Sequence, residues 1–139
     1  MSLWLKILIG FILLLIIAVG VAWFSLSAPD RAIARNPIMS EIRKAHQPWE
    51  TRLTLLGSVF QAGQSKSEFE KIVKTASFIP NPDFRLYFNK DDTIASTELV
   101  WSAKQGSLVC NMEWAIIAQF DEDNKLISAD GVVSERGCL

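Results

Sequence analysis

Two cysteines carry the chemistry that this sequence suggests most clearly. Cys110 and Cys138 are the 2 cysteines among its 139 residues, and both lie near the end of the chain. A pair with no third cysteine favours a disulfide in an oxidising compartment, whereas the alternative is two unrelated buried thiols. A bridge between these positions would stabilise the fold by about 3–4 kcal/mol if cross-links act through chain entropy.

Other residues that support catalysis or metal binding are too scattered to make a site. His46 is the single histidine and has no cysteine near it in the sequence, which disfavours a metal centre. A nucleophilic pair of Cys110 with His46 is disfavoured because Cys110 falls on the apolar face of an expected strand. The acidic run 121–123 lacks the spacing of a calcium loop, and no Gly-x-Ser-x-Gly elbow occurs. We therefore expect no catalytic residue, metal, cofactor or small-molecule substrate.

The chain is organised around an apolar run, Leu3–Leu26. After Lys6 this run carries no charged side chain, and a helix of its length crosses the roughly 30 Å hydrocarbon core of a bilayer. Trp4 and Trp23 lie near its two ends, where interfacial aromatic residues are common. A cleaved signal peptide is the alternative, but the run is longer than the usual apolar region of such peptides. The sequence predicts a retained single-pass anchor.

Helices of the remaining chain are predicted from caps and apolar spacing. Ser65 and Glu68 form a capping box, and apolar residues follow at helical spacing as far as Ala76. Two further helices are expected, over residues 41–47 and 49–56. The second of these also suits a strand, because its central residues are Thr-Arg-Leu-Thr-Leu.

Strands are predicted in the second half of the chain. Residues 97–102 form the first candidate, and residues 108–120 alternate apolar with polar side chains, as in a half-buried strand. Residues 125–134 return as its partner, with Gly131 as a candidate bulge. These three strands form an antiparallel meander.

The turn between the last two strands sets the register of the cysteines. A two-residue turn puts Glu122 opposite Lys125, and counting outward puts Cys138 opposite Val109. One bulge would therefore bring Cys138 to Cys110.

Three short stretches resemble a known family. They are Gly63–Phe69 at the start of the capped helix, Trp101 on the first long strand, and Ala118–Leu126 across the last hairpin. Together they resemble the SmpA/OmlA-like family of small envelope proteins, which includes a lipoprotein subunit of the outer-membrane β-barrel assembly machine. The resemblance covers Thr51–Val133 and implies two helices packed on a three-stranded antiparallel sheet, in a domain that docks to other proteins. The family's lipobox cysteine is replaced here by the apolar run.

The sequence thus predicts an α+β protein in three parts. Residues 1–27 are expected to be the transmembrane anchor, residues 28–48 a juxtamembrane linker with a short helix, and residues 49–139 a small two-layer domain. With 14 Lys and Arg against 15 Asp and Glu and no basic stripe, a nucleic-acid partner is not expected.

The expected function is that of a non-catalytic envelope accessory protein that docks to a partner protein or complex. One alternative is a small subunit of an inner-membrane complex held through the helix, and another is a thiol oxidoreductase. Most aromatic residues are expected in the core, but those that prove exposed would mark the docking surface. The candidates are Trp49, Phe60, Trp101 and Trp114.

Charge and cysteine usage disagree about the side of the membrane on which the domain lies. Lys6 precedes the apolar run, whereas Arg31, Arg35, Arg43 and Lys44 follow it. Counting these charges alone would put the domain in the cytoplasm. The cysteine pair and the family resemblance favour the periplasm, and we expect that orientation in a bacterial inner membrane.

Overall fold

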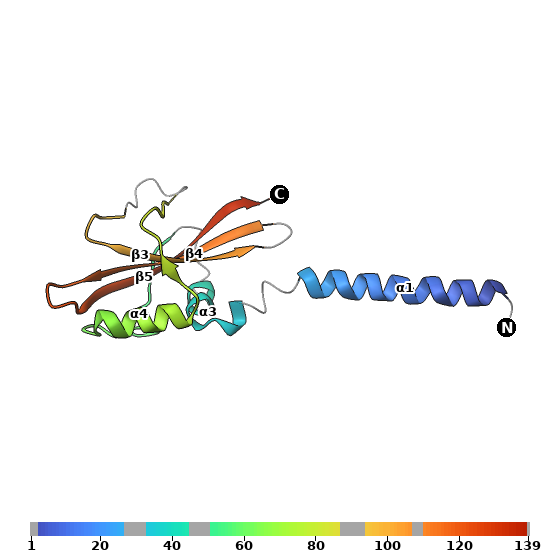
Figure 1. Ribbon diagram of the computed structural model, residues 1–139, viewed down its shortest axis with the longest axis horizontal. Coiled ribbons are helices and arrows are strands. Elements are labelled where there is room, and N and C mark those ends of the chain that lie inside the picture. Colours follow the sequence, from blue (N-terminus) through green and yellow to red (C-terminus); the bar gives the residue numbers. More distant parts are fainter. Residues whose placement is uncertain (1–2, 27–32, 45–50, 87–93, 107–109, 139) are drawn as a thin grey trace.

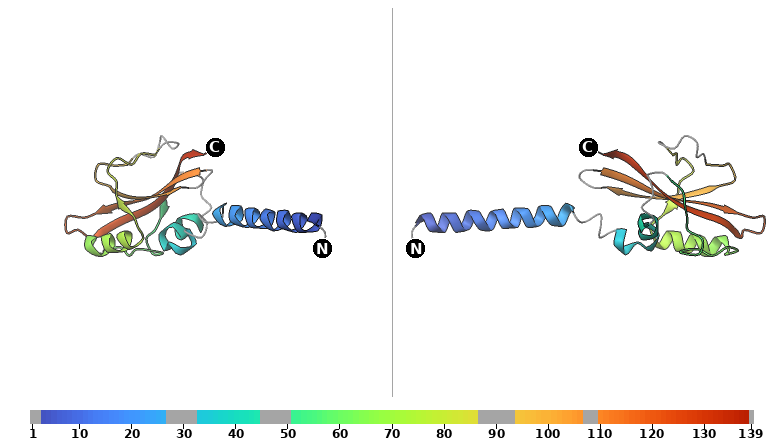
Figure 2. Two further views of the ribbon diagram at one scale, coloured as in Figure 1. Left: turned by 45° about the vertical axis from the view of Figure 1, so that its right-hand side comes forward. Right: turned by 180° about the vertical axis from the view of Figure 1, so that it is seen from behind.

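The computed structural model describes residues 3–26, 33–44, 51–86, 94–106 and 110–138 and shows an apolar helix followed by a small α+β domain (Figure 1). The helices are α1 (Leu3–Leu26), α3 (Pro37–Lys44) and α4 (Lys66–Thr75). The strands are β1 (Leu53–Thr54), β2 (Ile79–Pro80), β3 (Leu99–Gly106), β4 (Cys110–Phe120) and β5 (Leu126–Cys138). Figure 2 shows α3 and α4 side by side on one face of the sheet, while the chain that follows β2 crosses the other face.

Helix α1 is apolar on all sides. Every side chain from Trp4 to Phe24 is exposed, and none of this stretch is buried against the domain. By its length and composition the helix is able to span a membrane.

The sheet has five antiparallel strands in the order β1-β5-β4-β3-β2. The predicted meander is present as β3, β4 and β5, but the expected number of three strands is wrong because a two-residue strand extends each edge. In β1 Leu53 pairs with Gly131, and in β2 Pro80 pairs with Trp101. Proline is tolerated in β2 because this strand lies at the edge. Strands this short have no alternation by which a sequence could reveal them.

Strand β4 is buried on both faces. Trp114 and Ile116 belong to the main core under the helices, whereas Ala115 and Ile117 belong to a second apolar cluster around Phe84. The half-buried strand predicted here is therefore wrong for its second face, which the chain after β2 covers.

Helix α4 begins at the predicted capping box. The amide of Glu68 donates to Ser65 Oγ at 3.4 Å, and the amide of Ser65 donates to Glu68 Oε2 at 3.2 Å. Phe69 and Val73 lie on the apolar face and are buried in the main core. The side chains that satisfy the first turn thus also fix which face of the helix meets the sheet.

The end of α4 is a Schellman motif. The amide of Ser77 donates to the carbonyl of Lys74 at 3.0 Å, and the amide of Phe78 donates to the carbonyl of Val73 at 2.9 Å. Ser77 has a φ of 64°, a left-handed conformation that usually favours glycine. The motif turns the chain so that Phe78 returns to the core.

Helix α3 starts earlier than the expected residue 41. Asn36 caps it, because Asn36 Oδ1 accepts the amides of Ile38 at 3.1 Å and Met39 at 3.2 Å. Pro37 occupies the first helical position, where its missing N–H is not needed. The Asn-Pro pair therefore starts the helix, although it had been assigned to the linker.

Part of the expected linker belongs to the domain. Ile33, Ile38 and Ile42 are buried in the main core, so packing begins well before residue 49. The helix predicted over 49–56 is wrong in its described part, since Leu53–Thr54 form β1.

Gly131 is required for packing, and the bulge predicted at this residue is absent. It pairs with Ile116 in the regular ladder, and the register shifts lie at Cys110/Met112 and Gln119/Phe120. A Cβ at Gly131 would lie 2.4 Å from Ile42 Cγ1 and 3.2 Å from Leu55 Cδ1. Glycine at this position allows α3 to approach β5.

This close approach gives a double-mutant test. Gly131→Ala should destabilise the fold by about 1–3 kcal/mol, because the added methyl group overpacks the contact with Ile42. The same change in an Ile42→Ala background should cost much less, because the clashing side chain is gone. Urea unfolding of the four proteins in detergent measures both costs. Equal costs in the two backgrounds would contradict the assigned contact.

Candidate functional site

The aromatic residues considered for docking lie in the core. Phe60, Trp101 and Trp114 are between 1% and 5% exposed, and Trp49 lies outside the described residues. Phe69 of α4 contacts Phe60 and Trp101, with ring centroids 4.6 and 4.9 Å away. These three residues are therefore core residues and not the exposed aromatic residues that a docking surface was expected to present, and Phe60 and Trp101 pack against Phe69 of α4.

The two cysteines occupy opposed positions on neighbouring strands. The predicted two-residue turn is wrong, because the amide of Asp121 donates to the carbonyl of Lys125 at 2.9 Å and Phe120 pairs with Leu126. A register shift between Gln119 and Phe120 restores the predicted pairing from there on, with Met112 opposite Glu135. A register shift between Cys110 and Met112 then puts Cys110 opposite Cys138. Opposed Cα atoms of antiparallel strands are about 4.5–5.5 Å apart, a separation that a disulfide spans. The backbone register is compatible with the predicted bridge, and the disulfide itself stays a prediction.

No metal centre is assembled from the described part of the chain. His46 lies outside it, and within the described ranges no three His, Cys, Asp or Glu side chains are grouped to hold an ion. In the exposed β4–β5 turn, Asp121 Oδ1 accepts the amides of Asp123 at 3.0 Å and Lys125 at 2.7 Å. These acidic residues form the turn.

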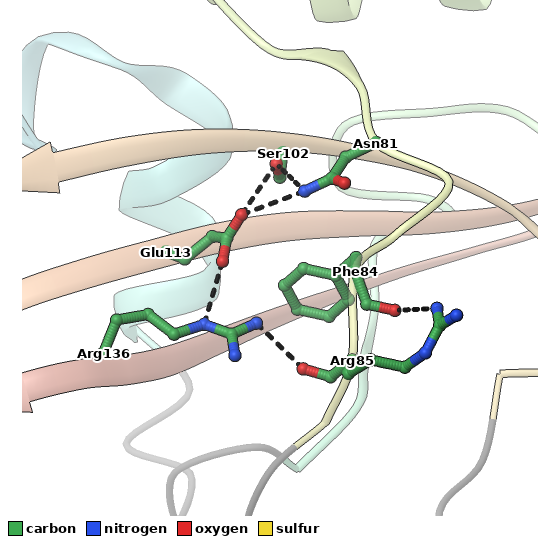
Figure 3. Close-up of polar contacts among 6 residues, drawn as sticks. All are labelled: Asn81, Phe84, Arg85, Ser102, Glu113 and Arg136. Carbon is green, nitrogen blue, oxygen red and sulfur yellow. Dashed lines mark hydrogen bonds and ion pairs between the residues drawn. The ribbon is translucent and has the colours of Figure 1, made fainter.

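A buried carboxylate is the centre of a polar cluster on the second face of the sheet (Figure 3). Glu113 is 5% exposed, and its Oε1 accepts hydrogen bonds from Ser102 Oγ and Asn81 Nδ2, both at 3.0 Å. Its Oε2 accepts from Arg136 Nε at 2.9 Å. A buried charge is tolerated only when paired and hydrogen-bonded, and three side chains meet that requirement here.

The same cluster fastens the cover segment, residues 81–86, to the sheet. Asn81 begins this segment, and Arg136 Nη2 donates to the carbonyl of Arg85 at 2.9 Å. The Arg136 guanidinium also lies over the ring of Phe84, with 5.3 Å between its Cζ and the ring centroid. Figure 3 shows these contacts converging from β3, β4, β5 and the cover segment.

The role of this cluster is to hold the cover segment on the sheet. A hollow of about 600 Å³ opens beside it, lined in part by Asp83, Lys104 and Asn111. Both oxygens of Glu113 already accept hydrogen bonds from protein donors, so the carboxylate is held as an anchor for the cover segment. This role could not be predicted from the sequence, because Glu113 is one of the polar residues in the alternation over residues 108–120, and such residues face water in a half-buried strand.

A second ion pair joins Arg52, which precedes β1, to Glu98, which precedes β3. Arg52 Nη1 lies 2.6 Å from Glu98 Oε1, and Arg52 Nη2 donates to Glu98 Oε2 at 3.2 Å. The hydrogen bond from Arg52 lowers the pKa of Glu98, and the amide of Ala95 adds to the effect. The contribution of this pair to stability is fully present above the ordinary pKa of Glu and is lost as the pH falls through the lowered value.

A larger hollow lies on the helical side of the domain. This α3–α4 hollow has a volume of about 800 Å³ and lies where the start of α3 meets α4. Asn36 joins the two helices there, because its Nδ2 donates to the carbonyl of Ala76 at 2.8 Å. The lining includes Arg35, Pro37, Glu68, Lys71, Ile72 and Ala76. Ile72 belongs to the predicted apolar face of α4, and this face is the feature of the sequence that relates to the hollow. In the structure Ile72 is only half-buried, so part of the face stays uncovered.

Comparisons of the chain with protein-family models, with curated proteins and with solved structures found no match.

The fastening role of Glu113 can be tested by neutralising it. Glu113→Gln should lower the free energy of unfolding by about 2–4 kcal/mol, since it removes the charge that Arg136 faces in a partly buried site. Glu135→Gln is the matched control on the neighbouring strand and should change stability by less than about 0.5 kcal/mol. Chemical denaturation measures both variants. Equal, small effects would show that Glu113 does not hold the cover segment.

Proposed function

We propose that this chain is a membrane-anchored accessory protein whose domain docks to a partner protein without catalysis. The observation that carries the proposal is α1, which exposes apolar side chains on all sides and joins a separately packed domain. A domain tethered in this way meets a membrane-resident partner at a high effective concentration, so a modest surface is enough for binding. The α3–α4 hollow is the open feature that such docking could use.

The proposed location is a bacterial inner membrane with the domain in the periplasm. Support comes from the opposed positions of Cys110 and Cys138, which suit a structural disulfide in an oxidising compartment. The basic residues after α1 favour the opposite side, but a very short N-terminal tail commonly stays inside. The resemblance to the SmpA/OmlA-like family, whose members lie in the envelope, agrees with this location and is part of the proposal.

A second candidate function places the contact in α1 itself. A shallow hollow of about 460 Å³ lies on this helix around Gly20, lined by Leu15, Ile16, Val19 and Trp23. A neighbouring transmembrane helix could approach closely at such a position. In this case the protein would be a small subunit of a membrane complex held through its helix.

An anchor exchange separates the two functions. A photo-crosslinking residue is placed at Thr75, on the domain, and the chain is expressed with its own α1 or with an unrelated apolar helix. Docking through the domain predicts the same cross-linked product with both anchors, because the exchanged helix only holds the domain at the membrane. Loss of the product on exchange would favour the helix contact, and its absence with both anchors would contradict docking near Thr75.

A further inference from the structure

The α3–α4 hollow combines an uncovered apolar floor with a basic rim. Ile72 and Ala76 lie one turn apart on α4 and are only half-buried, and Pro37 faces the hollow from the first turn of α3. Their apolar surface is left over after the main core has been filled. At about 800 Å³ the hollow is large enough for a few side chains of a bound peptide.

The charges at the rim are predominantly positive. Arg35 and Lys71 are exposed, and neither forms an ion pair with a residue of the described ranges. Glu68 is the acidic lining residue, and its Oε2 accepts hydrogen bonds from the amide of Ser65 at 3.2 Å and from Ser65 Oγ at 2.7 Å. These bonds cap α4, so the one carboxylate of the hollow has a structural partner, whereas the two cations face solvent.

The short stretch of chain between α1 and α3 limits where a segment bound in the α3–α4 hollow can come from. Arg35 follows Leu26 by nine residues, and an extended chain of that length spans at most about 30 Å. When α1 spans a bilayer, this rim lies within reach of the membrane surface. A partner segment that enters the hollow must therefore lie close to that surface.

We propose that the α3–α4 hollow binds an acidic, apolar peptide segment that lies next to the membrane in a membrane-protein partner. Apolar side chains of the segment cover Ile72 and Ala76, while its carboxylates pair with Arg35 and Lys71. This inference rests on the proposed docking function and names its surface and the chemistry of its partner. Charge complementarity at the rim would set specificity and association rate more than total affinity.

The test uses the full chain, labelled with ¹⁵N, in zwitterionic detergent micelles. The probe is a short peptide of alternating Glu and Leu with blocked ends, and the control peptide has Lys in place of Glu. We expect saturable shifts of the Lys71, Ile72 and Ala76 amides with the Glu peptide only. Added salt should weaken the binding, because the pairs are exposed at the rim.

Charge reversal at the rim of the hollow, compared with charge reversal elsewhere on α4, provides the variants. Lys71→Glu combined with Arg35→Glu should weaken binding of the Glu peptide at least about tenfold, whereas Lys74→Glu should change it less than about twofold. Lys74 is exposed on the same helix but does not line the hollow. Unchanged amide shifts of the sheet confirm that each variant is folded.

Three results would overturn the proposal. They are equal binding of the Glu and Lys peptides, equal effects of the combined Lys71 and Arg35 reversal and of the Lys74 reversal, and shifts of the hollow with protein concentration alone, which would identify a second copy of the chain as the occupant. The anchor exchange judges docking separately. If its cross-linked product persists while the peptide test fails, the domain still docks, through other contacts.

Discussion

The burial of β4 on both faces is the constraint on which the rest of the domain depends. A strand in this position needs a cover on each side, and α3 with α4 supplies one while the cover segment supplies the other (Figure 1). Glu113 lies on this strand, so its charge must be satisfied inside the protein. Arg136, Ser102 and Asn81 do so, and these contacts fix the position of the cover segment. The burial of β4 and the pairing of the Glu113 carboxylate therefore depend on the same cover segment.

The open surface follows from how the helical cover is assembled. Gly131 lets α3 approach β5, and Asn36 links the start of α3 to the end of α4. Helix α3 is short and, joined to α4 in this way, does not cover all of the apolar surface of α4. The α3–α4 hollow is the part that stays uncovered. When α1 spans a membrane, this hollow stays near the membrane surface, because α3 follows α1 closely in the sequence. The packing of α3 on the sheet thus also leaves open the surface that is proposed for docking.

Most of what could be predicted from the sequence depends on local signals, and most of what could not depends on distant residues. The capping box at Ser65 needs only neighbouring residues, and it is present in the structure. The β4–β5 register agrees with the prediction from Met112 to Gln119 only because the register shift between Gln119 and Phe120 offsets a turn that is longer than predicted. The start of α3 was missed, because the helix was expected from residue 41, whereas Asn36 caps it and Pro37 is its first residue. Glu113 looked like a solvent-facing residue, since nothing local indicates that residues 81–86 return over it. Phe60, Trp101 and Trp114 could not be told from surface anchors without knowing which side chains surround them.

The claim that unites this account is that the domain lies on the oxidising side of the membrane with Cys110 bonded to Cys138. Labelling of intact spheroplasts with a membrane-impermeant maleimide tests it most directly, before and after treatment with an impermeant phosphine. With this location and bond, no labelling is expected before reduction, and labelling of both thiols is expected after it. A Cys110→Ser variant, whose remaining thiol has no partner, should be labelled without reduction and serves as the positive control. Labelling of the native chain without reductant, or only after the membrane is permeabilised, would contradict the account.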